Sequence, residues 1–316
     1  MRIAVVGAGG IGGFLAAMLS RAGNTVSVVA RGEHLTAIRT HGLRVSSGTF
    51  GEMTVRIEAA PDLRELSQVD CILLCTKAHQ TRAILNQLVE GPSASADLVT
   101  LQNGLPFWYF ADRSMRAVDP DGALRQHIPD ARIMGGVVHA SGSVLQPGVI
   151  RHDGGFRYPL GEASGPISSR LEKLVTCFLA AGLQSTCESE IRIATWRKLF
   201  GNVALNPISA LTGATVHAML RDATIRELLI HVVSEARAVA AASGIDVAET
   251  LEARIGHIET LADVKTSMLQ DLEAHRELEL DPIVGATLEI ARSFDVPTPR
   301  IAALYALTQL RAATHS

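Results

Sequence analysis

Near its N-terminus the chain reads Ile3-Ala4-Val5-Val6-Gly7-Ala8-Gly9-Gly10-Ile11-Gly12. The apolar run over residues 3–6 predicts a buried strand, and a helix to about residue 22 is expected after the glycines. A second apolar run over residues 26–29 completes a β-α-β unit. In the G-x-G-x-x-G pattern, glycines permit a tight turn, let backbone approach a pyrophosphate and allow close helix–strand packing. The helix start supplies N–H donors, so we expect a bound nicotinamide or flavin dinucleotide. The expected cofactor-binding residues of this loop are Gly7, Ala8, Gly9, Gly10, Ile11 and Gly12.

Length, composition and charge describe a globular protein with two cores. The chain has 316 residues, 47% of them hydrophobic and 19% charged, and its formal net charge is -3. A single core rarely spans such a length. Because the sequence has no run of Lys or Arg, we expect neither nucleic acid nor an anionic membrane as a partner. The ligand is therefore expected to be small. The sequence has no signal-peptide pattern and no membrane-spanning apolar stretch, and the cysteine spacing described next leads us to expect a cytoplasmic protein.

Four cysteines are spaced unlike a zinc or redox motif. They are Cys71, Cys75, Cys177 and Cys187, and no pair forms C-x-x-C. The first two lie in the apolar run 69–75, which predicts a buried parallel strand. We therefore expect core thiols, with no metal site and no disulfide.

The remaining pattern divides the chain near Glu188. Apolar runs over 3–6, 26–29, 72–74, 98–101 and 133–138 alternate with helical patterns, which predicts a parallel α/β sheet. Short strands and turns are expected over 151–161, and a closing helix over 168–181. Residues 107–130 interrupt the pattern, and their role is not assigned. We predict that residues 1–188 form a Rossmann-type, NADP-binding α/β domain.

Beyond Glu188 the periodicity is helical. Helices are expected over 191–205, 225–242, 247–261, 283–294 and 300–310. Their ends carry matching signals: Gly244 after one helix, Asp246 with Glu249 as a capping box, and Asp281-Pro282 as N-cap and first helical position. We predict an all-helical substrate and catalytic domain over 189–316.

Arg31 bears on the choice of cofactor. An NAD-binding unit normally ends its second strand with an acid that binds the ribose hydroxyls, whereas here the strand is followed by Arg31. A guanidinium pairs well with a 2′-phosphate, so NADP(H) is favoured. Glu33 is close by, so a solvated Arg31 stays open as an alternative. Lys77 and Asn103 follow the third and fourth strands, where they are either ligand residues or plain turn residues.

Lys198, Asn202 and Asn206 form a polar stripe. Their spacing of four and four puts them on one face of a helix whose flanking residues are apolar, so we expect them to line a cavity. An exposed polar face is the alternative reading. A lysine ammonium can stabilise the charge that develops on a ketone oxygen during hydride addition and can donate a proton to it.

These residues together resemble the ketopantoate reductase (2-dehydropantoate 2-reductase) family over nearly the whole chain. The matching motifs are the glycine loop, Lys77, Gln102-Asn103-Gly104, Trp196-x-Lys198-Leu199 with Asn202 and Asn206-Pro207, and Ser267-Met268-Leu269-Gln270-Asp271 with Glu279. The resemblance implies NADPH-dependent reduction of 2-dehydropantoate to (R)-pantoate, a step toward pantothenate and coenzyme A. The sequence departs from the family pattern in two places, and both bear on the substrate. Residues 212–218 differ from those that often follow Asn206-Pro207 in the family, and the excursion over 107–130 is longer than expected.

The resemblance also implies individual roles. Lys198 would donate the proton, and Asn202, Asn206 and Ser267 would hold the substrate. Asn103 and Glu279 would lie where cofactor and substrate meet. Ala140 would lie against the cofactor, and Arg31 and Lys77 would bind its adenosine phosphate end.

Three other functions stay open. The first is the same chemistry on another small branched 2-oxo acid, and the second is a non-catalytic NADP(H)-sensing protein. The third is a histidine-based dehydrogenase that uses His139 or His275, although lone histidines are more often structural. A homodimer is compatible with the apolar helix over 225–242, which an intradomain core explains equally well.

Overall fold

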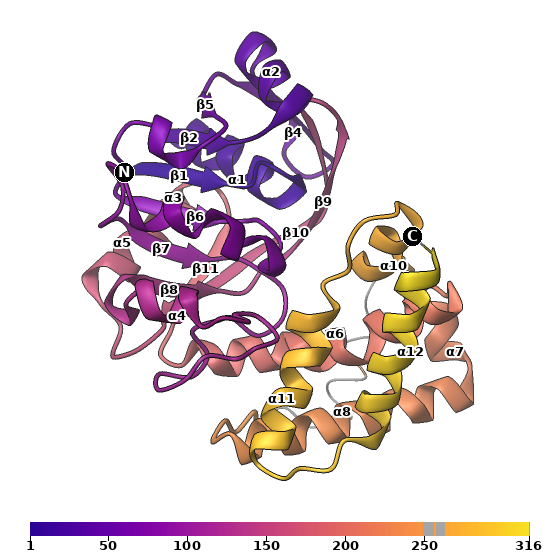
Figure 1. Ribbon diagram of the computed structural model, residues 1–316. Coiled ribbons are helices and arrows are strands. Elements are labelled where there is room, and N and C mark those ends of the chain that lie inside the picture. The colour runs from indigo at the N-terminus through magenta and orange to yellow at the C-terminus, as the bar shows by residue number, and fades with distance from the viewer. Residues whose placement is uncertain (249–255, 257–262, 316) are drawn as a thin grey trace. The chain divides into compact units, whose positions relative to one another are not determined.

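The chain divides into two compact units. The computed structural model describes residues 1–248, 256 and 263–315 (Figure 1). Unit 1 comprises Met1–Gln102, Phe110–Arg113 and Gly122–Ile191, and unit 2 comprises Asn103–Tyr109, Ser114–Asp121 and Arg192–Ser316. The division is therefore not linear along the sequence, because two pieces of the 103–121 segment belong to the second unit.

Unit 1 is an α/β unit with a parallel centre. The strands at the expected positions are β1 (Arg2–Val6), β2 (Thr25–Val29), β6 (Cys71–Leu74), β7 (Asp97–Thr100) and β8 (Ile133–Gly136). Figure 1 shows β2, β1, β6 and β7 as neighbouring arrows, and all of these pairings are parallel. The chain moves to β2 on one side of β1 and to β6 on the other, so the order of strands reverses at β1. Ligands of such sheets bind beyond the carboxyl ends of the strands at this point.

Six further strands extend the sheet. They are β3 (Leu43–Ser47), β4 (Gly51–Val55), β5 (Glu58–Ala60), β9 (His139–Gln146), β10 (Val149–Glu162) and β11 (Gln184–Glu188). The prediction of short strands and turns over 151–161 was wrong, because β10 is one strand of 14 residues. Its glycines sit at an irregularity of the β9 pairing between His152 and Gly154 rather than at a turn.

Helix α1 is the core helix of unit 1. Its residues Phe14, Leu15 and Leu19 are fully buried in one cluster with Val5 and Val28 of the sheet. Helix α5 begins after Ser168, whose hydroxyl accepts from the Leu171 amide, as expected for a closing helix. The helices of unit 1 are α1 (Gly10–Arg21), α2 (Gly32–His41), α3 (Leu85–Val89), α4 (Ala123–His127) and α5 (Ser169–Ala180). Short 3-10 turns span Leu63–Glu65, Ala78–Gln80, Arg82–Ile84 and Asp130–Arg132.

The described part of unit 2 is helical, without a strand. Its helices are α6 (Ile191–Thr212), α7 (Val216–Arg221), α8 (Ala223–Ala242), α10 (Ser267–Glu273), α11 (Ala286–Ser293) and α12 (Pro299–His315). Both α11 and α12 pack against α8. The helix expected over 247–261, with Glu249 of its capping box, lies almost entirely outside the described residues.

Two expected helix boundaries in unit 2 were wrong. Helix α6 does not end at residue 205 but continues through Pro207, because the buried residues around the proline hold the helix together despite one missing hydrogen bond. Asp281 is not an N-cap, since the helical backbone already begins at Leu280 and leads into a π-helical turn over Asp281–Gly285. The Asp281 carboxylate instead accepts from the Tyr305 hydroxyl at 2.6 Å.

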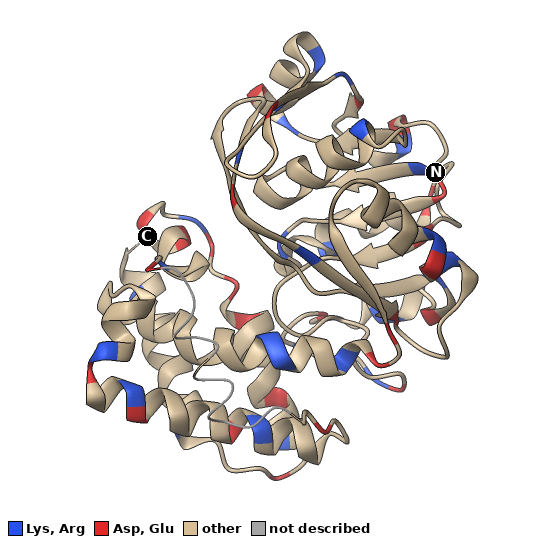
Figure 2. Ribbon diagram, turned by 180° about the vertical axis from the view of Figure 1, so that it is seen from behind, with Lys and Arg blue, Asp and Glu red and all other residues tan. Residues whose placement is uncertain are grey.

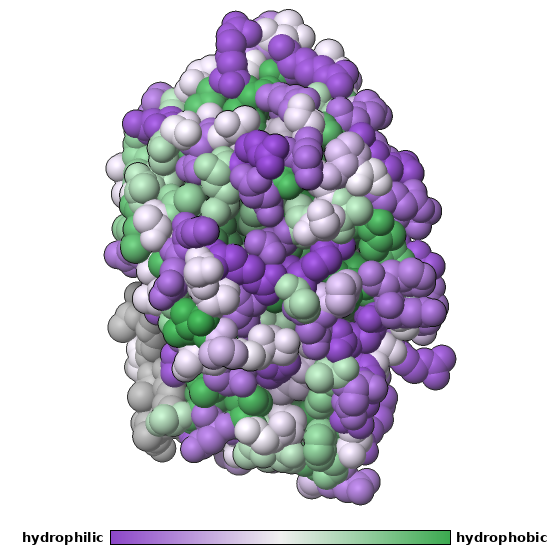
Figure 3. Space-filling view, turned by 90° about the vertical axis from the view of Figure 1, so that its left-hand side faces the viewer, coloured by the Kyte–Doolittle hydropathy of each residue, from purple (hydrophilic) through white to green (hydrophobic). Residues whose placement is uncertain are grey.

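The surface is mixed in charge and hydropathy. Figure 2 shows basic and acidic residues interspersed along both units. On the face in Figure 3, hydrophobic side chains form small separate areas among hydrophilic ones. Among the described helices, none is long and apolar enough to cross a membrane.

The close packing of α1 on β1 can be tested with Gly12→Ala. The added Cβ would lie 2.0 Å from the Gly7 oxygen and 2.9 Å from the Cys75 Cβ, so we expect unfolding free energy to fall by about 1–3 kcal/mol. Urea unfolding measures this loss. Gly48→Ala is the control, because its Cβ meets no atom within 4 Å. Equal losses in both variants would contradict the packing argument.

Candidate functional site

The glycine loop is closely packed on two sides and open on the third. Gly7 adopts a left-handed φ of 98°, and its amide and that of Ala8 donate to the Val29 carbonyl, both at 3.3 Å. A Cβ on Gly10 would lie 2.0 Å from the Gly142 oxygen of β9. At Gly9, by contrast, an added Cβ meets no atom of the described residues within 4 Å. The loop therefore leaves space where the backbone of a dinucleotide-binding motif approaches the pyrophosphate.

The first turn of α1 is suited to an anion. Its N-cap Gly9 has no side chain to cap the helix, and the first turn carries no acidic residue. The N–H groups and the positive end of the helix dipole are thus not neutralised by the protein's own side chains. Together with the open space at Gly9, this donor set fits a dinucleotide pyrophosphate.

The other predicted cofactor residues also lie in unit 1. Arg31 follows β2 as the N-cap of α2, and its exposed side chain makes no hydrogen bond or ion pair with the described residues. Lys77, half-buried, follows β6 and precedes a 3-10 turn. Ala140 lies in β9, two residues before the Gly142 that faces Gly10. Parallel pairing of β1, β2 and β6 brings the loop, Arg31 and Lys77 to one edge of the sheet.

Three predicted residues of unit 2 form a hydrogen-bonded chain. The Lys198 Nζ donates to the Asn103 Oδ1 at 2.7 Å, and the Asn103 Nδ2 donates to the Glu279 Oε2 at 2.9 Å. The orientation of the amide follows from chemistry, because an ammonium only donates and a carboxylate only accepts. Residues separated by 95 and 176 positions in the sequence are thus joined through one side chain.

Gly104 holds Asn103 in place. The Leu105 amide donates to the Pro282 carbonyl at 2.8 Å, which ties this loop to the chain just after Glu279. Gly104 has a left-handed φ of 84°, and an added Cβ would lie 2.2 Å from that same carbonyl oxygen. The Asn103-Gly104 pair is recognisable in the sequence as a turn or a ligand site, whereas its contact with Pro282 has no local signal in the sequence.

Tyr109 gives the start of the 107–130 excursion a structural role. Its buried hydroxyl accepts from the Trp196 Nε1 at 2.8 Å and bonds to the Ser243 Oγ at 2.8 Å. Its carbonyl accepts from the Arg192 Nε at 2.9 Å. Tyr109 therefore anchors the segment that begins at Asn103 to the helix that carries Lys198. The run of four aromatic residues over 107–110 was the only sequence signal for this anchor.

Lys198 is poised to exchange a proton near neutral pH. Its side chain is half-buried, and burial lowers its pKa to about 8, while the negative charge of Glu279 acts in the opposite direction. Below that pH the group is mostly an ammonium, yet it is more acidic than an ordinary lysine. Such a group can act as a general acid.

The remaining predicted substrate residues do not join this chain of hydrogen bonds. Asn202 is half-buried on α6, and Asn206 is 4% exposed with an Nδ2 that has no hydrogen-bond partner among the described residues. Ser267 is exposed at the start of α10, where Thr266 provides the cap, and it forms no hydrogen bond with the described residues. The structure thus brings together Lys198, Asn103 and Glu279.

The two histidines considered for an alternative dehydrogenase make other contacts. The His139 Nε2 lies 3.2 Å from the Arg157 Nη2, and the His275 Nδ1 lies 2.9 Å from the His315 carbonyl oxygen. The His275 contact is one with a backbone carbonyl, not the His–carboxylate pair that such an enzyme requires.

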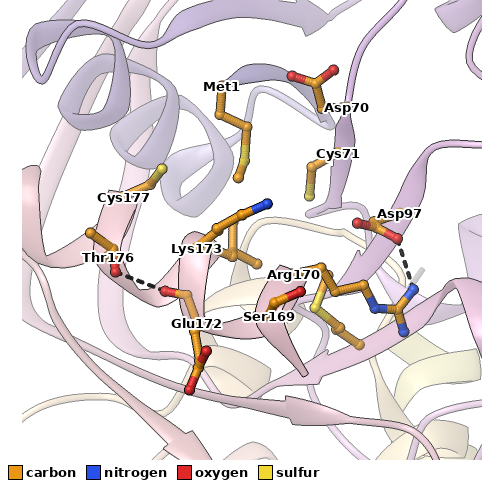
Figure 4. Close-up of a pocket in the computed structure, with 12 residues that line it drawn as sticks. Met1, Asp70, Cys71, Asp97, Ser169, Arg170, Glu172, Lys173, Thr176 and Cys177 are labelled. Atoms are coloured by element: carbon orange, nitrogen blue, oxygen red, sulfur yellow. Dashed lines mark hydrogen bonds and ion pairs between the residues drawn. The ribbon is translucent and has the colours of Figure 1, made fainter. Parts of the chain in front are cut away.

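A separate cavity of about 740 Å³ lies at the amino ends of β6 and β7 (Figure 4). Asp97 and Arg170 form an ion pair there at 2.7 Å, and Arg170 also pairs with Glu162. None of the predicted site residues lines this cavity. Burial raises the pKa of the Cys71 thiol in its wall, so this thiol stays neutral, as expected for a core cysteine. Cys75, Cys177 and Cys187 are partly buried against the same core.

The chain is similar to known proteins over nearly its whole length. The family described as "Ketopantoate reductase PanE/ApbA" matches residues 3–165, and its C-terminal counterpart matches residues 190–312. A 2-dehydropantoate 2-reductase of Mesorhizobium japonicum is 41% identical over 318 residues, covering 98% of this chain and 97% of that protein. The crystal structure of 2-dehydropantoate 2-reductase from Methylococcus capsulatus has a TM-score of 0.87 at 29% identity, covering 100% of this chain and 98% of that one. A ternary structure of D-mandelate dehydrogenase with NADH and anilino(oxo)acetate has a TM-score of 0.87 at 24% identity, covering 100% and 99%, and shares the fold.

The coupling of Lys198 to Glu279 can be measured directly by titration. In NMR of protein with labelled lysine side chains, we expect Lys198 to titrate near pH 8. Glu279→Gln removes the charge that favours the ammonium, so the midpoint should move lower. Glu277→Gln, an exposed neighbour that is not among the groups acting on Lys198, is the control. An unchanged midpoint in Glu279→Gln would show that the two groups are not coupled.

Proposed function

Since this chain belongs to the ketopantoate reductase family, we propose that it reduces 2-dehydropantoate to (R)-pantoate with NADPH, on the route to pantothenate and coenzyme A. The family is one of oxidoreductases, and the substrate, the cofactor and the residue roles are our proposal. The observation that carries it is the hydrogen-bonded chain Lys198–Asn103–Glu279.

Lys198 is the proposed proton donor. The glycine loop would hold NADPH, which would supply the hydride for the ketone carbon. Negative charge then develops on the ketone oxygen, where the Lys198 ammonium stabilises it and gives up a proton. A pKa of about 8 suits this role, because the group is protonated at neutral pH yet acidic enough to release its proton.

Asn103 keeps Lys198 and Glu279 from forming a direct ion pair. Its amide bonds to both, so the charges interact through a neutral group. A direct ion pair would stabilise the ammonium more strongly and make it a weaker acid. Glu279 accepts the hydrogen bond from Asn103 through Oε2, and its Oε1 makes no hydrogen bond with the described residues. We assign Oε1 to a hydroxyl group of the substrate.

The asparagines of α6 are assigned to the polar groups of the substrate. The Asn206 Nδ2 is buried and has no partner in the part of the chain that the structure describes, and such an amide nitrogen typically costs about 1–3 kcal/mol. A substrate carboxylate or hydroxyl would relieve this cost by accepting from Nδ2. Asn202, one turn earlier, and Ser267 are assigned as further substrate contacts.

The cofactor residues are assigned by their place at the sheet edge. Gly7, Ala8, Gly9, Gly10, Ile11 and Gly12 would hold the pyrophosphate, with Ala140 beside it. Arg31 and Lys77 would bind the adenosine phosphate end, and Asn103 and Glu279 would lie at the nicotinamide end. The absence of an acid at the end of β2 supports NADPH over NADH.

The alternatives concern the acid reduced and whether turnover occurs. Another small 2-oxo acid would use the same groups. Because D-mandelate dehydrogenase has a similar fold and was solved with NADH and anilino(oxo)acetate, other 2-oxo acids and NADH should be assayed as well. A protein that only senses NADP(H) would not depend on Lys198. The cytoplasmic location and a homodimer stay predictions, the latter testable by light scattering.

Lys198→Ala tests the mechanism and the substrate together. With 2-dehydropantoate and NADPH we expect kcat to fall by about 10²–10⁴-fold, because the general acid is lost. Lys173→Ala, at an exposed lysine of α5, should leave turnover unchanged. Unaltered turnover in Lys198→Ala would exclude the proposed proton donor. If the wild-type protein reduced other 2-oxo acids but not 2-dehydropantoate, the proposed substrate would be wrong.

Arg31→Ala tests the cofactor choice. Loss of a charge-assisted contact to the 2′-phosphate should raise the KM for NADPH by about tenfold or more and leave the KM for NADH unchanged. Arg56→Ala, at another exposed arginine of unit 1, is the matched control. Equal KM changes for both cofactors would contradict a role in 2′-phosphate recognition.

A further inference from the structure

We propose that His34 is a positioning residue that sets the glycine loop for binding the cofactor pyrophosphate. The inference rests on the proposed dinucleotide binding and adds a residue that no glycine motif contains. His34 lies in the first turn of α2, half-buried, and contacts the loop across 26 positions of sequence.

The two ring nitrogens of His34 bind two different backbone segments. The Gly148 amide, in the turn between β9 and β10, donates to the His34 Nδ1 at 3.0 Å. The His34 Nε2 lies 2.8 Å from the Ala8 carbonyl oxygen of the glycine loop. A backbone amide only donates, so Nδ1 is the acceptor, and Nε2 carries the hydrogen that it donates to Ala8. The neighbours therefore select one neutral tautomer.

The contact with Ala8 orients a donor in the loop. A peptide unit is planar and trans, so the Ala8 carbonyl and the Gly9 N–H point in opposite directions. With the carbonyl bound to His34, the Gly9 N–H points away from that side chain. The Gly9 amide nitrogen has no hydrogen bond to the described residues, and the space beside Gly9 is open. His34 thus keeps the Gly9 N–H available for a pyrophosphate oxygen.

The same histidine links the loop to the hairpin that covers it. Gly142 of β9 lies against Gly10, and Gly148 at the end of this hairpin is bound by His34. The two contacts limit movement of the loop from both sides. Arg31 lies three residues before His34, so an effect on the pyrophosphate must be distinguished from an effect on the 2′-phosphate.

A series of substitutions separates the two contacts of His34. A glutamine amide reaches the position of Nε2 and can donate to Ala8, whereas an asparagine amide reaches only the position of Nδ1 and can accept from Gly148. His34→Ala removes both contacts. His41→Ala, at an exposed histidine at the other end of α2, is the matched control.

The experiment measures the Kd values of NADPH and NADH by calorimetry and kcat at saturating NADPH. We expect His34→Ala to weaken both cofactors equally, by about tenfold, because both carry the pyrophosphate. The kcat should change little, His34→Gln should restore most of the affinity, and His34→Asn should not. The ratio of the two Kd values should stay that of the wild type.

Three results would overturn the inference. They are wild-type affinity in His34→Ala, a loss confined to NADPH, and equal behaviour of His34→Gln and His34→Asn. The last comparison decides the matter even if His34→Ala does not fold. A wild-type protein that binds neither cofactor would instead refute the proposed function.

Discussion

Helix α1 can lie against the end of β1 only because Gly7 and Gly12 have no side chains. A Cβ on Gly12 would be 2.0 Å from the Gly7 oxygen, inside any tolerable contact. This close packing puts the uncapped start of α1 at the carboxyl edge of the sheet. Arg31 and Lys77 reach the same edge because β2 and β6 run parallel to β1 on its two sides. The proposed cofactor site of unit 1 follows from this one steric requirement.

In unit 2, the proposed catalytic groups depend on the neutral amide of Asn103. It bonds to a cation and an anion at once, so Lys198 is coupled to Glu279 without a direct ion pair. Gly104 and Tyr109 support this arrangement, one by a close approach to Pro282 and the other by a hydrogen bond from Trp196. A lysine with a pKa of about 8 results from burial opposed by the nearby carboxylate.

Much of the fold could be predicted because local patterns record which face of a segment is buried. Apolar runs located β1, β2, β6, β7 and β8, and helical periodicity located α6, α8, α11 and α12, whereas the short helices α7 and α10 were not predicted. The errors arose where packing overrode a local breaker. Gly154 and Gly155 lie inside β10, and Pro207 lies inside α6, since neighbouring elements hold both segments in regular structure.

Local sequence patterns were sufficient to locate the glycine loop, the alternation of strands and helices, and Lys198, Asn202 and Asn206 on one face of a helix. Each of these depends on residues a few positions apart, whose geometry the backbone repeat dictates. The three-dimensional packing was needed to find that Asn103 bonds to both Lys198 and Glu279, and that His34 bonds to both Ala8 and Gly148. Those contacts join segments distant in sequence, and their partners are chosen by how the elements pack, which no local spacing encodes.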